Sequence, residues 1–202
     1  MRLLNIKKKN KAYSVYEDSE YLGIIYKSDF DKAGIDADNA EGETEVDDDT
    51  VKCIRDIVSY RAYDKGVSLL TDSEKCAEDI RLKLRMKSFP DYAIEEAISL
   101  LYEYNYLNDE RFAEAFVRTY MNQKSKSMII KELGMRHVNV PSLSEIIDRV
   151  YDEEDMTEDK AIDRLMKRFE GQDMSDDKTR RRAAALLIRH GFSFEQINNR
   201  LT

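Results

Sequence analysis

The chain has little of what enzymes, secreted proteins and sheet-rich folds usually depend on. Its 202 residues include no Trp, 2 Pro, 7 Gly, 2 Cys and 2 His. So few Pro and Gly favour a helix-rich protein, because sheets and long loops need more turn residues. The spacing typical of zinc ligands is not found among the Cys and His residues, which are Cys53, Cys76, His137 and His190. We therefore expect no metal and two buried free thiols.

Long hydrophobic runs are also missing. No stretch approaches the roughly 18 apolar residues that cross a bilayer. Residues 1–9 lack the apolar core and cleavage site of a signal peptide. We therefore expect a cytoplasmic protein with no membrane partner.

Motifs that carry catalysis are absent from the sequence as well. It has no Gly-rich phosphate loop, no supported Ser/His/Asp arrangement and no acids at metal-ligand spacing. His137 and His190 are expected at equivalent helix ends in different repeats, which indicates a structural role. The prediction is a protein that is not an enzyme and needs no cofactor.

The net charge of −8 is concentrated in one segment. Residues 29–49 contain ten acids and one base, Lys32, for a sum of −9, so the other 181 residues sum to +1. A basic surface elsewhere is therefore compatible with the acidic total. Residues 36–49 have almost no apolar content, and we expect them to form an exposed linker.

The N-terminal residues show strand patterns. Residues 11–16 and 21–26 are rich in aromatic and β-branched side chains, and the polar residues 17–20 between them predict a hairpin. An isolated hairpin is marginal in water, so we expect a third strand from residues 3–6 or packing on a helix. Residues 28–34 are expected to form one or two helical turns.

From Thr50 onward the apolar spacing is helical, and the pattern repeats. Three segments, 84–89, 133–138 and 187–192, align as helix ends with a cationic or imidazole side chain followed by a hydrophobic residue. A helix start signal follows each one. These signals are Pro90, the pair Ser142 and Glu145, and the pair Ser193 and Gln196, the two pairs being capping boxes.

A joint at residues 106–116 belongs to the same pattern. Asn108 is a good N-cap, and Phe112 and Phe116 lie on one helix face as core. The spacing of Phe112, Phe116 and Tyr120 recurs 49 residues later, after a predicted N-cap at Thr157. The predicted fold is therefore mainly α, an elongated array of three tri-helical repeats with a small N-terminal β-hairpin or three-stranded element. The expected domains are residues 1–48 (β element and acidic linker), 49–107, 108–156 and 157–202 (the three repeats).

Basic side chains form the candidate binding surface. Residues 110–138 carry six bases against three acids, and a second cluster opens the penultimate helix. The candidate partner- or DNA-binding residues are Arg111, Arg118, Lys124, Lys126, Lys131, Arg136, Lys178, Arg180, Arg181 and Arg182. Arg111 and Arg118 are expected to be free to face a partner. Reversing Arg111, Arg118, Lys124 and Lys126 to Glu is expected to weaken binding and leave helicity intact.

The segment 106–118, YLNDERFAEAFVR, resembles the signature of the RecX family of RecA regulators. Residues 82–90, 129–133 and 182–193 are also similar to that family, so the resemblance covers essentially the whole chain. It implies a monomeric, non-enzymatic inhibitor that lies in the groove of the RecA–DNA filament and regulates repair, homologous recombination and the SOS response. The acidic residues 29–49 and the pI near 5.0 depart from what we would expect of this family, so we expect DNA itself to be bound only weakly. The alternative from the residues alone is a stand-alone helical DNA-binding module that uses residues 178–182.

Overall fold

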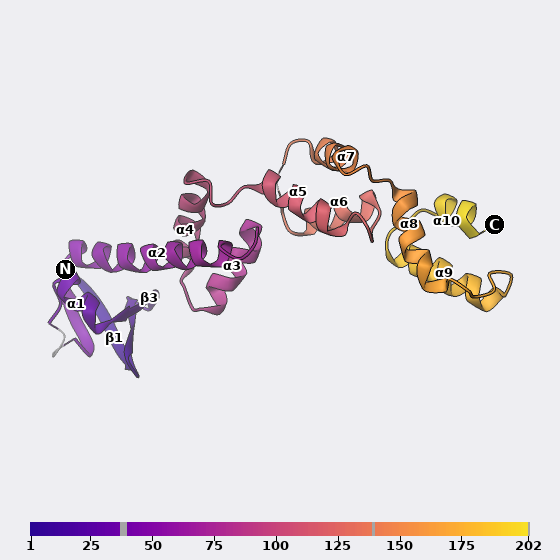
Figure 1. Cartoon of the computed structure of the whole chain (residues 1–202). Coiled ribbons are helices and arrows are strands. Elements are labelled where there is room, and N and C mark those ends of the chain that lie inside the picture. Colours follow the sequence, from indigo (N-terminus) through magenta and orange to yellow (C-terminus); the bar gives the residue numbers. More distant parts are fainter. Residues whose placement is uncertain (37–39, 139, 202) are drawn as a thin grey trace. The chain divides into compact units, whose positions relative to one another are not determined.

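A computed structural model describes residues 1–36, 40–138 and 140–201 (Figure 1). The chain divides into two compact units, Met1–Asn108 and Asp109–Thr202, which are described separately. The fold is mainly α with one small antiparallel sheet, as the sequence predicted. Among the described residues, no helix is both long and apolar enough to cross a membrane.

Unit 1 begins with a four-stranded antiparallel sheet in the order β3-β2-β1-β4. Its strands are β1 (Arg2–Lys9), β2 (Ala12–Glu17), β3 (Glu20–Tyr26) and β4 (Gly42–Val46). The predicted hairpin and third strand are confirmed. The prediction of an exposed linker over residues 36–49 is wrong for β4, which pairs with β1 and adds a fourth strand; residues 37–39 of that segment lie outside the described residues.

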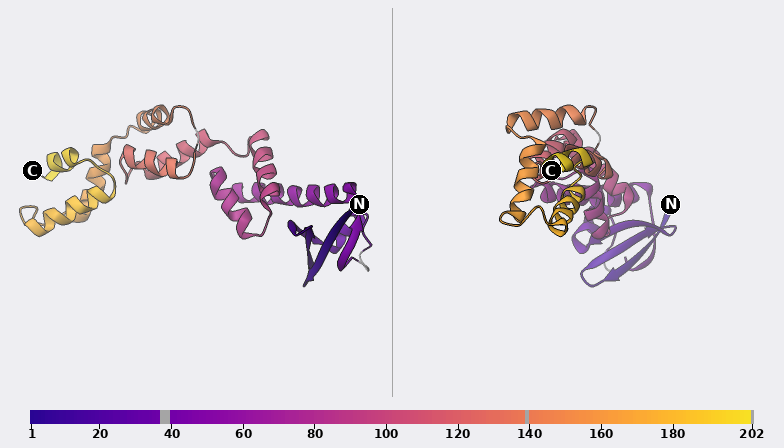
Figure 2. Two further views of the ribbon diagram at one scale, coloured as in Figure 1. Left: turned by 180° about the vertical axis from the view of Figure 1, so that it is seen from behind. Right: turned by 90° about the vertical axis from the view of Figure 1, so that its right-hand side faces the viewer.

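One face of the sheet is covered by two helices. Leu4, Ile6, Val15, Leu22 and Ile25 on this face are fully buried. The short helix α1 (Lys27–Ala33) and the long helix α2 (Asp48–Leu70) pack against β3 (Figure 2). At Gly23, which has φ +131°, a Cβ atom would lie 2.7 Å from Val58 Cγ1, so glycine allows the close approach of α2.

Two further helices, α3 (Ala77–Met86) and α4 (Asp91–Glu103), complete unit 1 and pack on α2 and on each other. Cys53 is half-buried and Cys76 is buried, and both are free thiols as predicted. The Sγ of Cys53 donates to the carbonyl oxygen of Lys32 at 3.3 Å, which links α2 to α1.

Unit 2 consists of two groups of packed helices. In the first, α5 (Asp109–Tyr120), α6 (Lys126–Met135) and α7 (Leu143–Glu153) contact one another. In the second, α9 (Asp177–Arg189) packs against both α8 (Glu158–Met166) and α10 (Phe194–Leu201), with a 3₁₀ turn η1 (Lys167–Phe169) after α8. The predicted core residues Phe112 and Phe116 are buried, with ring centroids 5.9 Å apart. The domain boundaries drawn from the repeat remain predictions.

The three aligned helix ends have the same backbone geometry. The amide of Phe89 donates to the carbonyl of Leu84, that of Val138 to Leu133 and that of Phe192 to Leu187, each at 3.2 Å. The residue before each donor is left-handed, with φ of 62° at Ser88, 54° at His137 and 87° at Gly191. This is the Schellman arrangement, which satisfies the last carbonyls of a helix. Equal bonds at all three ends give the repeat a physical basis.

The geometry corrects one expectation about the histidines. His137 occupies the left-handed position after α6, whereas His190 is the cap residue of α9, with φ −88°, one position earlier. The two imidazoles are therefore not at equivalent helix-end positions.

The capping predictions have mixed outcomes. The capping box of Ser193 and Gln196 is confirmed by reciprocal bonds of 2.9 and 3.2 Å. Thr157 caps α8 by accepting from the amide of Lys160 at 3.2 Å, also as predicted. The capping box of Ser142 and Glu145 is wrong, because Ser142 has φ −134° and makes no side-chain cap bond.

Candidate partner-binding surface

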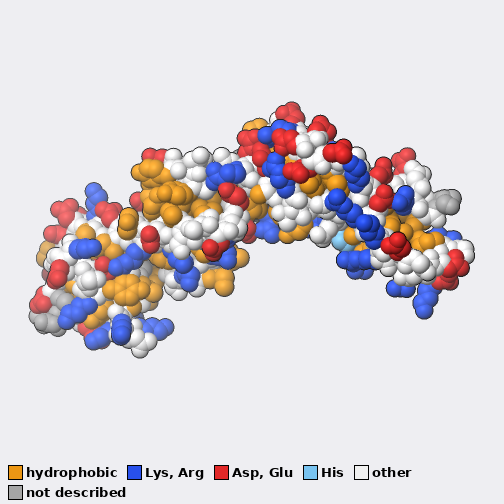
Figure 3. Space-filling model, in the orientation of Figure 1, with side chains coloured by type: hydrophobic (Ala, Val, Ile, Leu, Met, Phe, Trp, Pro, Cys, Tyr) orange, Lys and Arg blue, Asp and Glu red, His pale blue; other side chains and the backbone are white. Residues whose placement is uncertain are grey.

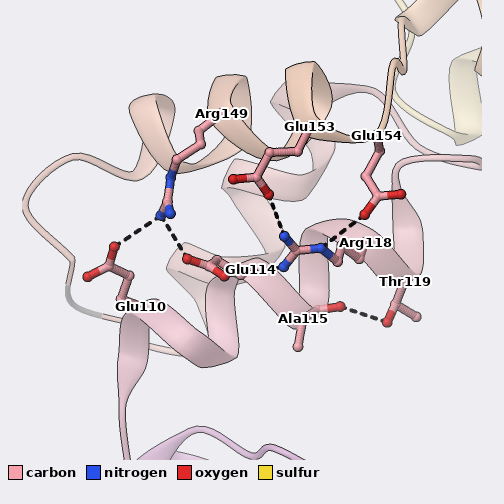
Figure 4. Close-up of polar contacts among 8 residues, drawn as sticks. All are labelled: Glu110, Glu114, Ala115, Arg118, Thr119, Arg149, Glu153 and Glu154. Atoms are coloured by element: carbon pink, nitrogen blue, oxygen red, sulfur yellow. Dashed lines mark hydrogen bonds and ion pairs between the residues drawn. The ribbon is translucent and has the colours of Figure 1, made fainter.

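Arg118 joins two helices of unit 2 instead of standing free. Its guanidinium donates to Glu153 at 2.6 Å, and to Glu154 and Glu114 at 3.2 Å (Figure 4). These hydrogen bonds, first of all the one to Glu114, raise the pKa of Arg118. The expectation that Arg118 is free to face a partner is therefore wrong. Its carboxylate partners lie on its own helix and at the end of α7.

A second arginine reinforces the same pair of helices. Arg149 on α7 donates to Glu110 at 3.1 Å and to Glu114 at 2.7 Å (Figure 4). Glu114 therefore accepts from both arginines and stands at the centre of the network. Since these side chains are partly exposed, each pair contributes only about 0.2–1 kcal/mol. Their joint effect is to fix how α5 lies against α7.

The next two bases of the predicted cluster are also engaged inside unit 2. Lys124 Nζ lies 2.6 Å from Glu132 Oε2 and 3.9 Å from the centroid of the Tyr120 ring. Lys126 Nζ lies 2.5 Å from Asp148 Oδ1 and 4.5 Å from the Tyr151 ring centroid. Ion pairs combined with cation–π contacts thus link Lys126 of α6 to α7, and hold Lys124, which lies between α5 and α6, against both of those helices. They are stabilising residues first.

The remaining bases of the first cluster differ in accessibility. Lys131 is exposed on α6, beside the exposed apolar side chains of Ile130 and Met135. Arg136 lies 5.6 Å from the centroid of Phe116, and Arg111 is half-buried at the start of α5. The structure therefore spreads the six predicted bases over different environments. Of the six, Lys131 is the one that the structure leaves exposed.

The second predicted cluster lies on the first two turns of α9. Asp177 pairs with both Arg180 and Arg181, in the second case at 2.9 Å. The Arg181 side chain is nevertheless 81% exposed. Arg182 lies 5.7 Å from the centroid of the Phe169 ring, which brings the start of α9 to η1. Arg180 and Arg181 also line a shallow groove with Ile197, Asn198 and Leu201 of α10.

The contact between Arg182 and Phe169 adds bases that the sequence reasoning missed. Lys167 and Arg168 directly precede Phe169 and are exposed. We define the C-terminal basic surface as Lys167, Arg168, Lys178, Arg181 and Arg182. Lys and Arg side chains are frequent over the segment that carries α8 and α9 (Figure 3). The adjacent pair at 167–168 was the available signal, but only the fold shows that it lies near α9.

The two helix groups of unit 2 are connected by buried polar contacts. Ser125, only 2% exposed, donates from its amide to His190 O at 3.0 Å and from its hydroxyl to Gly191 O at 2.7 Å. Glu158 accepts from the amide of Lys126 at 2.7 Å and from Gln196 Nε2 at 2.6 Å. These bonds join the start of α6 to the α8 and α10 starts and fix the bases of one group relative to those of the other.

Little in this surface resembles a reaction centre. Among the described residues, no group of three His, Cys, Asp or Glu side chains is placed to hold a metal ion. Burial raises the pKa of Tyr151 to about 12, so its phenol stays protonated at neutral pH. The arrangement offers exposed cations, a few apolar side chains and a fixed scaffold. The fold that carries these features is of the helical-repeat class.

Comparison with known proteins shows which regulatory proteins the chain is similar to. A family model described as the second three-helix domain of RecX matches residues 108–140, which span α5 and α6. The regulatory protein RecX of Bacillus velezensis is 28% identical over 201 residues, covering 95% of this chain and 72% of that protein. The regulatory protein RecX of Caldanaerobacter subterraneus is 26% identical over 196 residues, covering 96% and 94%. The chain is therefore similar to RecX proteins over nearly its whole length.

Solved structures support the fold. A crystal structure of a regulatory protein RecX aligns over 98% of both chains, with a TM-score of 0.56 and 19% identity. The crystal structure of RecX from Lactobacillus salivarius aligns over 71% of this chain and 94% of that one, with a TM-score of 0.51 and 19% identity. At this identity the likeness concerns the fold alone.

Proposed function

We propose that the protein inhibits the RecA recombinase by binding in the groove of the RecA–DNA filament, and so regulates homologous recombination and DNA repair. The observation that carries this proposal is the similarity to regulatory proteins RecX over 95% of the chain. The repeated helix ends support it, because they show that the chain is built of recurring helical units that could make repeated contacts along a filament. The proposed role is that of a binding protein without catalysis.

A filament is a suitable partner for a protein built of repeats. Several three-helix units on one chain can contact several recombinase subunits, and linked weak contacts raise the overall affinity without one strong site. Lys131 and the C-terminal basic surface supply exposed charge for such contacts. Lys124, Lys126 and Arg118 support them indirectly by fixing the helices.

The test is the ATPase activity of RecA on single-stranded DNA, measured with increasing amounts of this protein. We expect the ATPase and strand-exchange rates to fall at less than one protein per recombinase. A variant with Lys131 and the C-terminal basic surface changed to Gln is the matched comparison, because it keeps the ion pairs of Arg118, Lys124 and Lys126. Unchanged rates at equimolar protein would reject the proposal.

The C-terminal basic surface also favours a second candidate function, a stand-alone DNA-binding module. Five exposed bases around the start of a helix are suited to phosphate contacts. Titration of duplex DNA without recombinase separates the two functions. Tight, sequence-dependent duplex binding together with no effect on the ATPase would support the module instead.

A further inference from the structure

The most concentrated unpaired charge lies at the N-terminal hairpin of unit 1. Residues 1–16 contain five bases and no acid, in a chain whose net charge is −8. Four of the five, Lys7, Lys8, Lys9 and Lys11, lie within five residues around the turn between β1 and β2, and all four are exposed. Within the described part of the chain, no carboxylate forms an ion pair with any of them. We call these four lysines the hairpin lysines.

The hairpin lysines differ in this from three of the predicted bases of unit 2. Arg118, Lys124 and Lys126 already lie within 2.5–3.2 Å of carboxylates, so an external anion would have to compete for them. A lysine without a carboxylate partner can bind a phosphate without breaking an ion pair. Its binding also releases condensed counterions from the nucleic acid. The hairpin is therefore a better site for a negatively charged ligand than those three bases, although the net charge of −8 did not indicate it.

The open face of the sheet adds aromatic and polar groups next to these lysines. Side chains alternate along a strand, so Asn5 and Lys7 lie on the face opposite the buried Leu4 and Ile6. Asn5 pairs in register with Tyr16, and Tyr16 with Tyr21. Lys7 Nζ lies 5.1 Å from the Tyr16 ring centroid. Asn5, Lys7 and Tyr16 line one hollow, and the other residues that line it are Leu3, Asp18, Ser19 and Glu43.

The two acids of the hollow, Asp18 and Glu43, lie away from the basic β1–β2 turn, so the two ends of this face differ in charge. Glu43 pairs in register with Asn5, whereas Lys7 and Lys9 pair with Ser14 and Ala12, toward the β1–β2 turn. Asp18 belongs to the β2–β3 turn, at the opposite end of the hairpin from Lys9 and Lys11. An anionic ligand is thus directed to the β1–β2 end, and its uncharged parts toward Tyr16.

We propose that this surface binds single-stranded DNA, with the hairpin lysines on its phosphates and Tyr16 as a stacking platform for a base. Exposed lysines near the half-buried ring of Tyr16 provide both kinds of contact that sequence-independent binding uses. An anionic membrane is less well matched, because residues 8–11 at the tip include no large apolar side chain to insert. The proposal goes beyond RecA inhibition, because it concerns another surface and needs no recombinase.

The test is the fluorescence anisotropy of a labelled oligothymidylate with the full chain and no recombinase. If four phosphates are neutralised, affinity for the single strand should fall roughly 50-fold between about 50 and 200 mM salt. Changing all four hairpin lysines to Gln should remove most of the affinity and flatten this salt dependence. The matched control changes four other exposed lysines, Lys32, Lys52, Lys83 and Lys87, to Gln, with the same change in net charge. It should keep the affinity.

The platform is tested separately at Tyr16. Tyr16→Phe should keep binding, because it keeps the ring, whereas Tyr16→Ser should weaken it by roughly 5- to 150-fold. Circular dichroism of each variant confirms that the sheet and helices are retained. An equal loss in the control lysine variant, tighter binding to duplex, or tighter binding to anionic lipid vesicles would each overturn the proposal. Since recombinase is absent, none of these outcomes bears on RecA inhibition.

Discussion

One buried carboxylate fixes the edge of the sheet to the long helix of unit 1. Asp29 is 2% exposed, and its oxygens lie 2.6 and 2.7 Å from Arg61 Nη2 while one accepts from the Tyr26 amide at 2.7 Å. Asp29→Ala would leave a partly buried guanidinium unpaired. We expect a loss of about 2–4 kcal/mol in the free energy of unfolding, below the value for a fully buried pair because Arg61 is partly exposed. Urea unfolding followed by circular dichroism measures it.

Asp31→Ala is the matched control, because Asp31 lies exposed on the same short helix. We expect it to change the free energy of unfolding by less than about 0.5 kcal/mol. Equal losses in the two variants would show that the Asp29–Arg61 pair adds nothing beyond the loss of an acid from α1.

At the scale of residues, the sequence shows which side chains are charged but does not predict which of them form ion pairs within the fold. Arg118 was expected to be free because its neighbours in sequence leave it on a polar helix face. Its partners Glu153 and Glu154 are 35 and 36 residues away and reach it only because α5 packs on α7. Distances of that kind depend on tertiary packing, which charge patterns in a single sequence do not contain.

At the scale of elements, the repeat predicted the three aligned helix ends correctly. The low apolar content of residues 36–49, in contrast, led to a linker being predicted where strand β4 lies. Helix ends are local, because one Schellman turn involves only six successive residues, such as 84–89. The strand β4 has no comparable local signal. Its outward residues are Glu43 and Glu45 and its inward ones include Gly42 and Thr44, so the apolar alternation of a strand is missing. It forms because the exposed edge of β1 supplies the hydrogen bonds.

Gly191 offers a test of the junction inside unit 2. It has φ +87°, and an added Cβ would lie 2.6 Å from Met128 Cβ and 2.7 Å from Ser125 Oγ. Gly191→Ala should therefore lower the free energy of unfolding by more than the roughly 1–2 kcal/mol of a left-handed residue alone. Gly134, in α6, has open space around its Cβ position, and Gly134→Ala should instead stabilise by about 0.5–1 kcal/mol. Chemical denaturation of both variants measures these changes. If both substitutions changed the free energy of unfolding in the same direction, the close packing at Gly191 would be contradicted.

At the scale of the whole chain, net charge misled in a systematic way. The acids are concentrated in residues 29–49, and many of those in unit 2 are used in internal ion pairs, as Glu114, Glu132 and Asp148 show. Exposed bases gather at the hairpin and in the C-terminal part of unit 2. A total of −8 therefore coexists with basic surfaces suited to an acidic partner.

This distribution separates two kinds of base and gives a final prediction about inhibition. Changing the exposed bases Lys131, Lys178, Arg181 and Arg182 to Glu should raise the amount of protein needed for half-inhibition of the RecA ATPase by about 10-fold or more, because rim charges steer association. Their helices should keep the same thermal unfolding temperature.

Arg118→Glu is the contrasting variant. It would place a fourth carboxylate among Glu114, Glu153 and Glu154, and we expect a lower free energy of unfolding because like charges repel and three ion pairs are lost. The earlier expectation that reversing Arg118, Lys124 and Lys126 leaves helicity intact is therefore replaced by one of weakened packing between α5, α6 and α7. If the exposed-base variant inhibited RecA as well as the parent protein, these bases would not be the contact surface, and the partner would have to be sought on other faces of the repeats.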